Sequence, residues 1–280
     1  MNSEIKPLAA DFQFDYEAES TIEGRGTGAL RPRDLALTRL ERGLSAFVGL
    51  PAGAKVLEVG CGAGRQSRTL KKLRPDLQVY GCDLSERAIA EARSYNDGVE
   101  YKMADANRLP YDTATFEAVM LFDVLEHVPE VASVVGEVAR VLKPGGLFHG
   151  FIPIEGQPGT LFYRLQNSHR LPIARWKRER IGHIQQLTDS AVEQIFRSCG
   201  FSMRDKTYSF HLAGQIHDIA DYWRRDGLAD PTLAANRKKA VALLARLIFY
   251  PTWRLAYWED RLLARSNRAT GLHLTAVKMQ

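Results

Sequence analysis

Apolar residues recur along this 280-residue chain with two periods, one typical of buried strands and one typical of helices that pack on a sheet. Strand-like apolar runs occupy residues 54–59, 77–83, 99–105, 116–122, 145–153, 201–210 and 270–280. Helical spacing is found over residues 31–50, 65–73, 85–95, 128–144 and 188–200. Because strands that alternate with helices are joined by right-handed crossovers, this order predicts an α/β fold built on a parallel sheet.

Polar residues, prolines and glycines mark where these helices begin and end. Ser85 and Thr188 stand at N-cap positions, Pro144 is expected to stop one helix, and Gly200 follows the end of another. Residues 155–183 lack a clear period and are expected to form a loop or short helices. The pattern divides the chain into an N-terminal helical lid segment, a core with a basic insertion, a helical appendage and a final core strand, at residues 1–50, 51–208 (insertion 155–183), 209–270 and 271–280.

The composition is that of an ordinary soluble globular protein, with 45% hydrophobic and 25% charged residues. Cys61, Cys82 and Cys199 form no CxxC pair, so we expect reduced thiols in a cytoplasmic protein. The first residues are polar and acidic, unlike a secretory signal.

The net charge of +5 is accompanied by two basic segments, residues 155–183 and 237–268. Solvated surface is the simpler interpretation of both segments. The alternative is a face for an anionic partner, such as a phospholipid surface, a phosphorylated acceptor or RNA.

The segment VLEVGCGAGR (56–65) ends a buried strand in a glycine loop, which usually serves a cofactor because glycine lets a ligand approach the backbone. A triphosphate-binding loop requires Lys-Ser/Thr after the glycines, and here Arg65 and Gln66 follow Gly64, which excludes it. A dinucleotide fingerprint requires a third glycine where Arg65 stands. Asp83, at the end of the second strand, suits the ribose hydroxyls of a dinucleotide or of another adenosine ligand.

Four segments in this order and spacing decide between these ligands: VLEVGCGAGR, VYGCDLSERAI, MADANRLPYDTATFEAVMLFDVLEHV and RVLKPGGLF. With them, residues 50–208 and the last strand resemble the class I S-adenosylmethionine-dependent methyltransferases, of a small-molecule or lipid type similar to methyltransferase domain 11. The resemblance implies a seven-stranded Rossmann-like sheet of order 3-2-1-4-5-7-6 with an antiparallel last strand. It also implies S-adenosyl-L-methionine as the cofactor and S-adenosyl-L-homocysteine as the product.

The resemblance also implies roles for single residues. Glu58 would order the loop beneath the methionine, Asp83 would bind the ribose, and Asp105 would bind the adenine amino group. Because this cofactor has no phosphate, the loop needs close backbone approach at its glycines but no lysine. The implied cofactor-binding set is Glu58, Gly60, Cys61, Gly62, Gly64, Asp83, Leu84, Asp105, Ala106 and Phe122, with Cys61 as a small loop residue, Leu84 and Ala106 against the adenine, and Phe122 near the methionine end.

The expected chemistry is an in-line displacement, for which holding the acceptor close and aligned supplies most of the acceleration. A hydroxyl or ammonium acceptor must also lose a proton, and Asp123, His127 and His183 are the candidate catalytic bases. For His127, a structural hydrogen bond is the simpler interpretation. We expect no metal, because no acidic set with metal-ligand spacing stands out. We expect no nucleic-acid substrate, because Asn/Asp-Pro-Pro-Tyr and Pro-Cys motifs for base methylation are absent after the fourth strand.

The helical appendage contains an apolar and aromatic run, AVALLARLIFYPTWRLAYW, which Arg246, Pro251 and Arg254 interrupt. These interruptions argue against a membrane span. Three interpretations stay open: a lid on the sheet edge, a contact in a homodimer, or an interfacial helix pair on an anionic membrane surface. Aromatic residues beside arginines, such as Trp253 beside Arg254, are typical of interfacial helices.

The sequence therefore predicts an S-adenosylmethionine-dependent methyltransferase that acts on a small-molecule, lipid-linked or glycan-linked acceptor, with oxygen as the expected methylation site. It is expected in the cytoplasm, with a peripheral membrane position as an alternative. Two other functions stay open: a catalytically silent module that binds S-adenosylmethionine, and a nicotinamide-dependent oxidoreductase.

Overall fold

The computed structural model describes residues 15, 17, 41–43, 45–229, 231–232 and 234–280. Most of the predicted lid segment, residues 1–50, lies outside the described residues. Of the helix predicted over 31–50, the described part is helical at residues 41–43 and 45–47.

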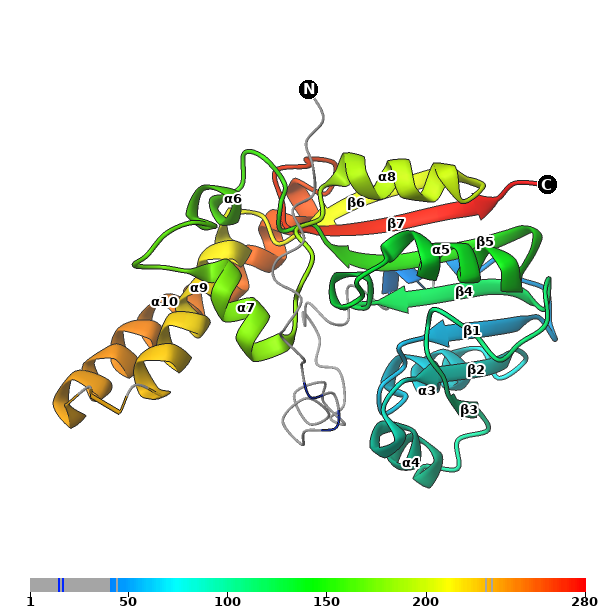
Figure 1. Cartoon of the computed structure of the whole chain (residues 1–280), viewed down its shortest axis with the longest axis horizontal. Helices are drawn as coiled ribbons and strands as arrows, with labels where there is room; N and C mark the ends of the chain where they lie inside the picture. The colour runs from blue at the N-terminus through cyan, green and yellow to red at the C-terminus, as the bar shows by residue number, and fades with distance from the viewer. Residues whose placement is uncertain (1–14, 16, 18–40, 44, 230, 233) are drawn as a thin grey trace.

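A seven-stranded sheet in the order β3-β2-β1-β4-β5-β7-β6 forms the centre of the described chain (Figure 1). Its strands are β1 (Lys55–Val59), β2 (Gln78–Asp83), β3 (Glu100–Met103), β4 (Phe116–Phe122), β5 (Leu142–Pro153), β6 (Phe201–Ser209) and β7 (Gly271–Lys278). Neighbours from β3 through β5 pair in parallel, and β7 runs antiparallel to both β5 and β6. The predicted α/β class, strand order and antiparallel last strand are confirmed.

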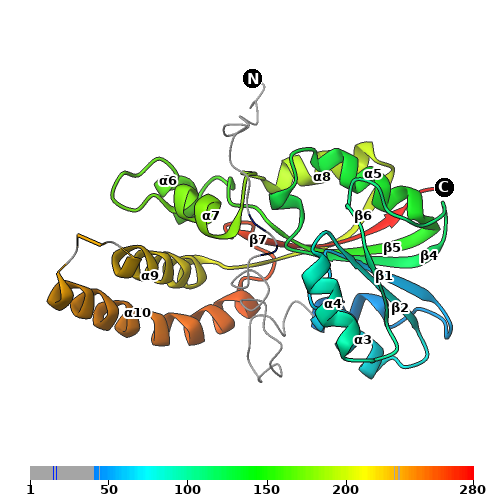
Figure 2. The ribbon, with the colours of Figure 1, turned by 60° about the horizontal axis from the view of Figure 1, so that its bottom comes forward.

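Helices cover both faces of the sheet (Figure 2). They are α3 (Arg65–Leu73), α4 (Glu86–Ser94), α5 (Val131–Val141) and α8 (Asp189–Ser198), with a short 3-10 helix, η1 (Leu125–His127), after β4. One core packs α5 and α8 on the sheet through residues such as Phe196, and a second packs Leu70 of α3 and Phe47 on the opposite face. Alternate residues of β4 enter the two cores, Leu121 the first and Phe122 the second, as the pleat of a strand requires.

The predicted helix caps are confirmed by hydrogen bonds. Ser85 Oγ accepts from the N–H of Ala88 at 3.0 Å, and Thr188 Oγ1 accepts from the N–H of Ala191 at 3.2 Å. Each bond satisfies one of the backbone donors that a helix leaves unpaired at its start. Gly200 follows α8 with a φ of 84°, in the left-handed region that glycine enters without strain.

The predicted helix end at Pro144 is wrong. Helix α5 already ends at Val141, and Pro144 lies inside β5. A proline disfavours helical backbone in the residue before it, so the chain becomes extended ahead of the proline rather than at it.

The basic insertion and the segment between β6 and β7 form one helical lobe at an end of the sheet (Figures 1 and 2). It consists of α6 (Leu161–Leu165), α7 (Ile173–Ile181), α9 (Leu212–Ala229) and α10 (Ala235–Leu262). Phe162 of α6, Trp176 of α7 and the α9 residues Ile219 and Tyr222 share one apolar core. The insertion therefore forms two short helices that pack against α9.

Helix α10 packs along α9 and continues through Pro251, the residue that interrupts the apolar run in the sequence. Its buried residues are mostly small: Ala245, Thr252, Ala256 and Asp260. The Asp260 carboxylate accepts hydrogen bonds from His211 Nδ1 at 2.7 Å and from the N–H of Phe210 at 3.0 Å. This carboxylate therefore ties the end of α10 to the chain segment that leaves β6.

Lys177 is buried in the lobe although it belongs to the basic insertion. Its ammonium group lies 2.8 Å from Glu155 Oε1 and 3.3 Å from Asp218 Oδ2, over the ring of Phe162. Burial alone would lower the pKa of Lys177, but the two carboxylates outweigh it and raise the pKa. The basic insertion thus uses one of its charges inside the protein rather than on the surface.

The turn between β1 and α3 is held from below by Glu58. Glu58 Oε2 accepts a hydrogen bond from the N–H of Ser67 at 2.9 Å and another from the Ser67 hydroxyl. Glu58 is 2% exposed, and burial raises the pKa of its carboxyl group to about 8. The pair fixes the start of α3 under the glycine loop.

A Glu58→Gln variant keeps the shape of this side chain and removes its titration. The folded pKa of Glu58 is about 8 against an ordinary 4.5, so the stability gained from its proton is complete below the unfolded value and is lost as the pH rises through 8. Between about pH 5 and about pH 9, the free energy of unfolding of the wild type should fall relative to the variant by on the order of 4 kcal/mol. Urea unfolding of both proteins at the two pH values measures this, and a pH-independent difference would contradict it.

Truncation of Trp176 should destabilise the helical lobe. Trp176 is 1% exposed and sits in the lobe core, whereas Trp258 on α10 is 55% exposed. Trp176→Ala should lower the free energy of unfolding by about 3–5 kcal/mol, and the matched Trp258→Ala control by less than about 0.5 kcal/mol. Denaturant unfolding followed by circular dichroism measures both, and equal effects would disagree with the packing of α7.

Candidate active site

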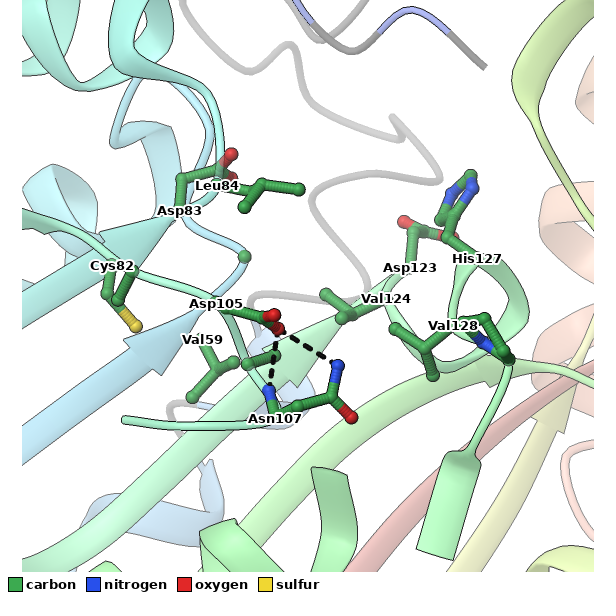
Figure 3. A pocket seen from close by; sticks show the side chains of 14 residues that line it. Val59, Cys82, Asp83, Leu84, Asp105, Asn107, Asp123, Val124, His127 and Val128 are labelled. Carbon is green, nitrogen blue, oxygen red and sulfur yellow. Dashed lines mark hydrogen bonds between the residues drawn. The ribbon is translucent and has the colours of Figure 1, made fainter. Parts of the chain in front are cut away.

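A pocket of about 300 Å³ lies at the carboxyl ends of β1, β2, β3 and β4 (Figure 3). Neighbouring β1 and β4 are the strands between which the sheet order reverses, and ligands of open α/β sheets bind at such a switch point. Acidic, small and apolar residues line it: Val59, Gly60, Cys82, Asp83, Leu84, Ala104, Asp105, Ala106, Asn107, Asp123, Val124, His127, Val128 and Pro129.

Asp83 lines the pocket at the end of β2, and backbone N–H groups hold its carboxylate. Oδ2 accepts from the N–H of Gly62 at 2.7 Å, and Oδ1 accepts from the N–H of Ser85 at 3.0 Å. One carboxylate thus joins the glycine loop to the start of α4. Each oxygen has a further lone pair, so the group can also accept bonds from two neighbouring hydroxyls, as a ribose offers.

Leu84, Asp105 and Ala106 line the pocket beside Asp83. Asp105 Oδ1 accepts from the backbone N–H of Asn107 at 2.8 Å and from its side-chain amide at 2.9 Å (Figure 3). These bonds fix a second carboxylate on the loop after β3. Leu84 is 57% exposed and offers an apolar side chain to a planar base, as does Ala106.

The three loop glycines serve different purposes. Gly60 and Gly64 have φ values of 72° and 77°, and a Cβ at these positions would collide with Val124 and with Tyr101 respectively. Gly62 has a φ of 51° and faces open space. Gly60 is also among the residues that line the pocket, whereas Gly62 and Gly64 are not, so the close approach of a ligand at these two glycines stays a prediction.

Four of the expected cofactor residues, Cys61, Gly62, Gly64 and Phe122, are not among the residues that line the pocket, and Glu58 lies beneath the loop. Cys61 is 5% exposed and packs against Tyr101, and burial raises the pKa of its thiol, as suits a small structural residue. Phe122 is 4% exposed and packs with Phe47 in the core on one face of the sheet. In place of Phe122, the next residue, Asp123, lines the pocket.

Asp123 and His127, two of the candidate bases, line the pocket after the end of β4 (Figure 3). Asp123 has a left-handed φ of 53°, and its N–H donates to the carbonyl of Phe151 at 3.1 Å. His127 Nδ1 lies 3.0 Å from the carbonyl oxygen of Gly182, and since a carbonyl only accepts, Nδ1 is the donor. In the neutral ring, the lone pair of His127 is then on Nε2.

His183, the third candidate base, is not among the residues that line the pocket, but packs edge-on against His127 with ring centroids 4.9 Å apart. It is 7% exposed, and its Nδ1 donates to Glu155 Oε1 at 2.9 Å. Burial alone would raise the pKa of Glu155, but Lys177 and His183 outweigh it and hold the pKa at about 2. Glu155 is therefore an ionised acceptor that orients His183.

Sequence reasoning missed Glu17, which lies beside the pocket wall. Its carboxylate accepts from the hydroxyl of Ser85 at 3.0 Å and from the N–H groups of Glu86 at 2.8 Å and Arg87 at 3.2 Å. An acidic group at the start of a helix is favourable there. No periodicity around Glu17 signals this contact. Asn107 was missed too, although Asp-Ala-Asn is a pattern from which its turn with Asp105 could have been inferred.

The pocket lies within a segment of the chain that matches a known protein family. Residues 57–149, which include every residue that lines the pocket, match a family described as methyltransferase domain. The chain is similar to 27-O-demethylrifamycin SV methyltransferase of Amycolatopsis mediterranei, 37% identical over 117 residues, or 40% of this chain and 43% of that protein. It is also similar to ubiquinone biosynthesis O-methyltransferase of Xanthomonas oryzae pv. oryzae, 33% identical over 156 residues, or 52% and 64%. The chain thus spans less than two thirds of the length of either relative.

The fold also resembles a solved structure of phosphoethanolamine N-methyltransferase 2 from Haemonchus contortus in complex with S-adenosyl-L-methionine. The TM-score is 0.59 at 20% identity, over 95% of this chain and 58% of the other. The pocket residues fit that cofactor, with carboxylates at Asp83 and Asp105 that can accept bonds from a ribose and from a base amine, and with the backbone of Gly60 in the pocket wall. Residues 57–149 therefore form a methyltransferase domain, and the fold around them is similar to that of a solved S-adenosylmethionine-dependent methyltransferase.

Proposed function

We propose that this protein transfers the methyl group of S-adenosylmethionine to a hydroxyl oxygen of a small-molecule acceptor. The observation that carries the proposal is that one pocket contains two carboxylates suited to different tasks. Asp83 can accept hydrogen bonds from ribose hydroxyls, and Asp123 is a candidate proton acceptor. Oxygen as the acceptor atom is supported by the relatives, whose names refer to 27-O-demethylrifamycin SV and to O-methylation in ubiquinone biosynthesis.

The residues beside β2 and β3 would hold the cofactor. When bound, S-adenosylmethionine supplies an activated methyl group on a sulfonium centre, which is a good leaving group. Asp83 would accept bonds from the ribose hydroxyls and Asp105 from the adenine amine, with Leu84 and Ala106 against the base. The N–H groups at the start of α3, after Gly64, would face the methionine carboxylate.

The residues after β4 would serve the acceptor. A hydroxyl that attacks the methyl carbon must lose its proton, and Asp123 lines the pocket with a group that can accept one. A positioned base contributes about 10²–10⁴-fold, and alignment of the acceptor supplies the larger share, up to about 7–11 kcal/mol. His127 lines the same wall and is the second candidate base, whereas His183 would act by positioning His127.

Methyl-labelled S-adenosylmethionine incubated with the protein and a cell metabolite extract tests this function. The label should appear in a small-molecule product, with S-adenosylhomocysteine formed in equal amount. Asp83→Ala should weaken cofactor binding by about 10–100-fold, because both ribose hydroxyls lose a charged partner. Calorimetry measures the affinity, with Asp112→Ala as the control, since Asp112 is an exposed carboxylate outside the pocket.

Two outcomes would count against the proposal. Cofactor binding without any turnover would identify a silent binding module rather than an enzyme. Equal cofactor affinity in Asp83→Ala and Asp112→Ala would remove Asp83 from the ribose site.

We further propose that the acceptor is lipid-like and that α10 rests on an anionic membrane surface. Seven large apolar residues of α10 are each more than half exposed: Leu243, Leu244, Leu247, Tyr250, Leu255, Trp258 and Leu262. Helix α9 covers the small residues of α10, so these larger side chains are left to the outside of the lobe. Exposed apolar surface of this kind marks an interaction site.

The charges on α10 favour an anionic surface as the partner. Arg246 lies over the ring of Tyr250 and Arg261 over that of Tyr257, and Arg254 is exposed between them. In the described part of the chain, none of these arginines forms an ion pair with a carboxylate. Arginines interleaved with aromatic and aliphatic residues are typical of helices that lie in a membrane interface. Among the described residues, none of the helices has the combined length and apolar character that crossing a membrane requires.

Co-sedimentation with anionic vesicles at low salt tests this second proposal. The wild type should bind anionic vesicles and bind neutral ones weakly, and added salt should weaken the binding. An Arg246→Ala/Arg254→Ala variant should bind about 30-fold more weakly, at about 1 kcal/mol for each arginine. Arg175→Ala, an exposed change on α7, is the matched control. Protein that stays in solution with anionic vesicles would contradict the proposal, and a dimer in light scattering would favour the homodimer interpretation of α10 instead.

A further inference from the structure

We propose that Glu126, His127 and His183 form a binding site for a divalent transition-metal ion beside the pocket. One ligand atom from each side chain lies within 4.8 Å of the others. Glu126 and His183 are buried, and His127 lines the pocket wall. A carboxylate with two imidazoles is a donor set that zinc and related ions use in proteins.

Hydrogen bonds at the far side of each ring turn both Nε2 atoms toward Glu126. His127 Nδ1 donates to the carbonyl of Gly182 at 3.0 Å, and His183 Nδ1 donates to the carboxylate of Glu155 at 2.9 Å. In each neutral ring the lone pair is then on Nε2. Both Nε2 atoms lie 3.6 Å from Glu126 Oε1. In this orientation the two ring nitrogens and a carboxylate oxygen of Glu126 face one another, as the ligands of a single metal ion do.

These distances suit a metal ion. Zinc binds nitrogen and oxygen at about 2.0–2.1 Å, which places neighbouring ligands of a tetrahedral ion about 3.3 Å apart. The observed 3.6 Å separations are longer by only a few tenths of an ångström. The third separation, between the two imidazole nitrogens, is within 4.8 Å. Side-chain adjustments that close these separations would bring the three ligand atoms to the bonding distance.

Other contacts already fix the ligands in place. The N–H groups of Ile184 and Gln185 donate to the carbonyl oxygen of Glu126 at 2.9 Å and 3.2 Å, which joins η1 to the segment that follows α7. Glu155, which orients His183, is itself held by Lys177 at 2.8 Å. A histidine ligand that donates its second N–H to a carboxylate or a carbonyl is the usual arrangement around protein-bound zinc.

The proposed site would keep one position open. Three protein ligands leave the fourth position of a tetrahedral ion for water or another oxygen ligand, as in catalytic zinc sites. Since His127 belongs to the pocket wall, this position would be near the part of the pocket that we assign to the acceptor. Metal binding itself does not depend on methyl transfer, so its test stands apart from that of the proposed function.

Cobalt(II) titration of the full-length chain, stripped with a chelator, tests the site. The wild type should bind a single ion with the strong visible absorption of tetrahedral cobalt, and zinc should displace it. His127→Ala, His183→Ala and Glu126→Gln should each weaken the affinity by more than about 100-fold, and Glu155→Gln by about 10–100-fold. His169→Ala removes an exposed histidine elsewhere and should leave the affinity unchanged.

Two results would overturn the site. One is a wild-type spectrum that stays that of hydrated cobalt, which does not depend on how any variant folds. The other is an equal cobalt affinity in His169→Ala and in the folded ligand variants.

Discussion

Two carboxylates hold the turn that links β1 to α3, and the rest of the site depends on this turn. Glu58 holds it from beneath through Ser67, and Asp83 holds it from the side through the N–H of Gly62. Both carboxylates bind backbone groups, so the shape of the turn depends little on the side chains within it. Cys61 can therefore pack inward while Gly62 has open space beside its backbone. Asp83 also holds the start of α4, so one residue sets two walls of the pocket.

The parts of the site that follow from local backbone geometry could be predicted from the sequence. Asp83 ends a strand next to the glycine loop, and parallel strands bring such ends together at one edge. The resemblance implied Phe122 near the methionine end of the cofactor, but Phe122 is not among the residues that line the pocket. Its neighbour Leu121 faces one core and Phe122 the other, so the pocket receives Asp123 after the strand ends.

Contacts between distant segments could not be predicted, because no spacing rule connects them. His183 meets His127 because α7 packs against α9 and its following loop is bonded to η1. We expected metal-independent chemistry because no acidic residues have the spacing of metal ligands in the sequence. Sequence spacing cannot show that the rings of His127 and His183 both lie near the carboxylate of Glu126. Lys177 is a similar case, since its charge in the sequence suggested surface, whereas Glu155 and Asp218 hold it inside the lobe.

The described chain has two parts: a cofactor half, which we expect to bind S-adenosylmethionine, and an acceptor half, which we expect to bind the acceptor. The cofactor half, at the ends of β1 to β4, lies within residues 57–149, the segment that matches the family. The helical lobe lies outside that segment. The relatives of this chain have names that refer to different acceptors, 27-O-demethylrifamycin SV for one and ubiquinone biosynthesis for another. A common first half with a variable second half is expected when one cofactor serves many acceptors. The lobe, rather than the glycine loop, is therefore the part that we expect to determine which acceptor is methylated.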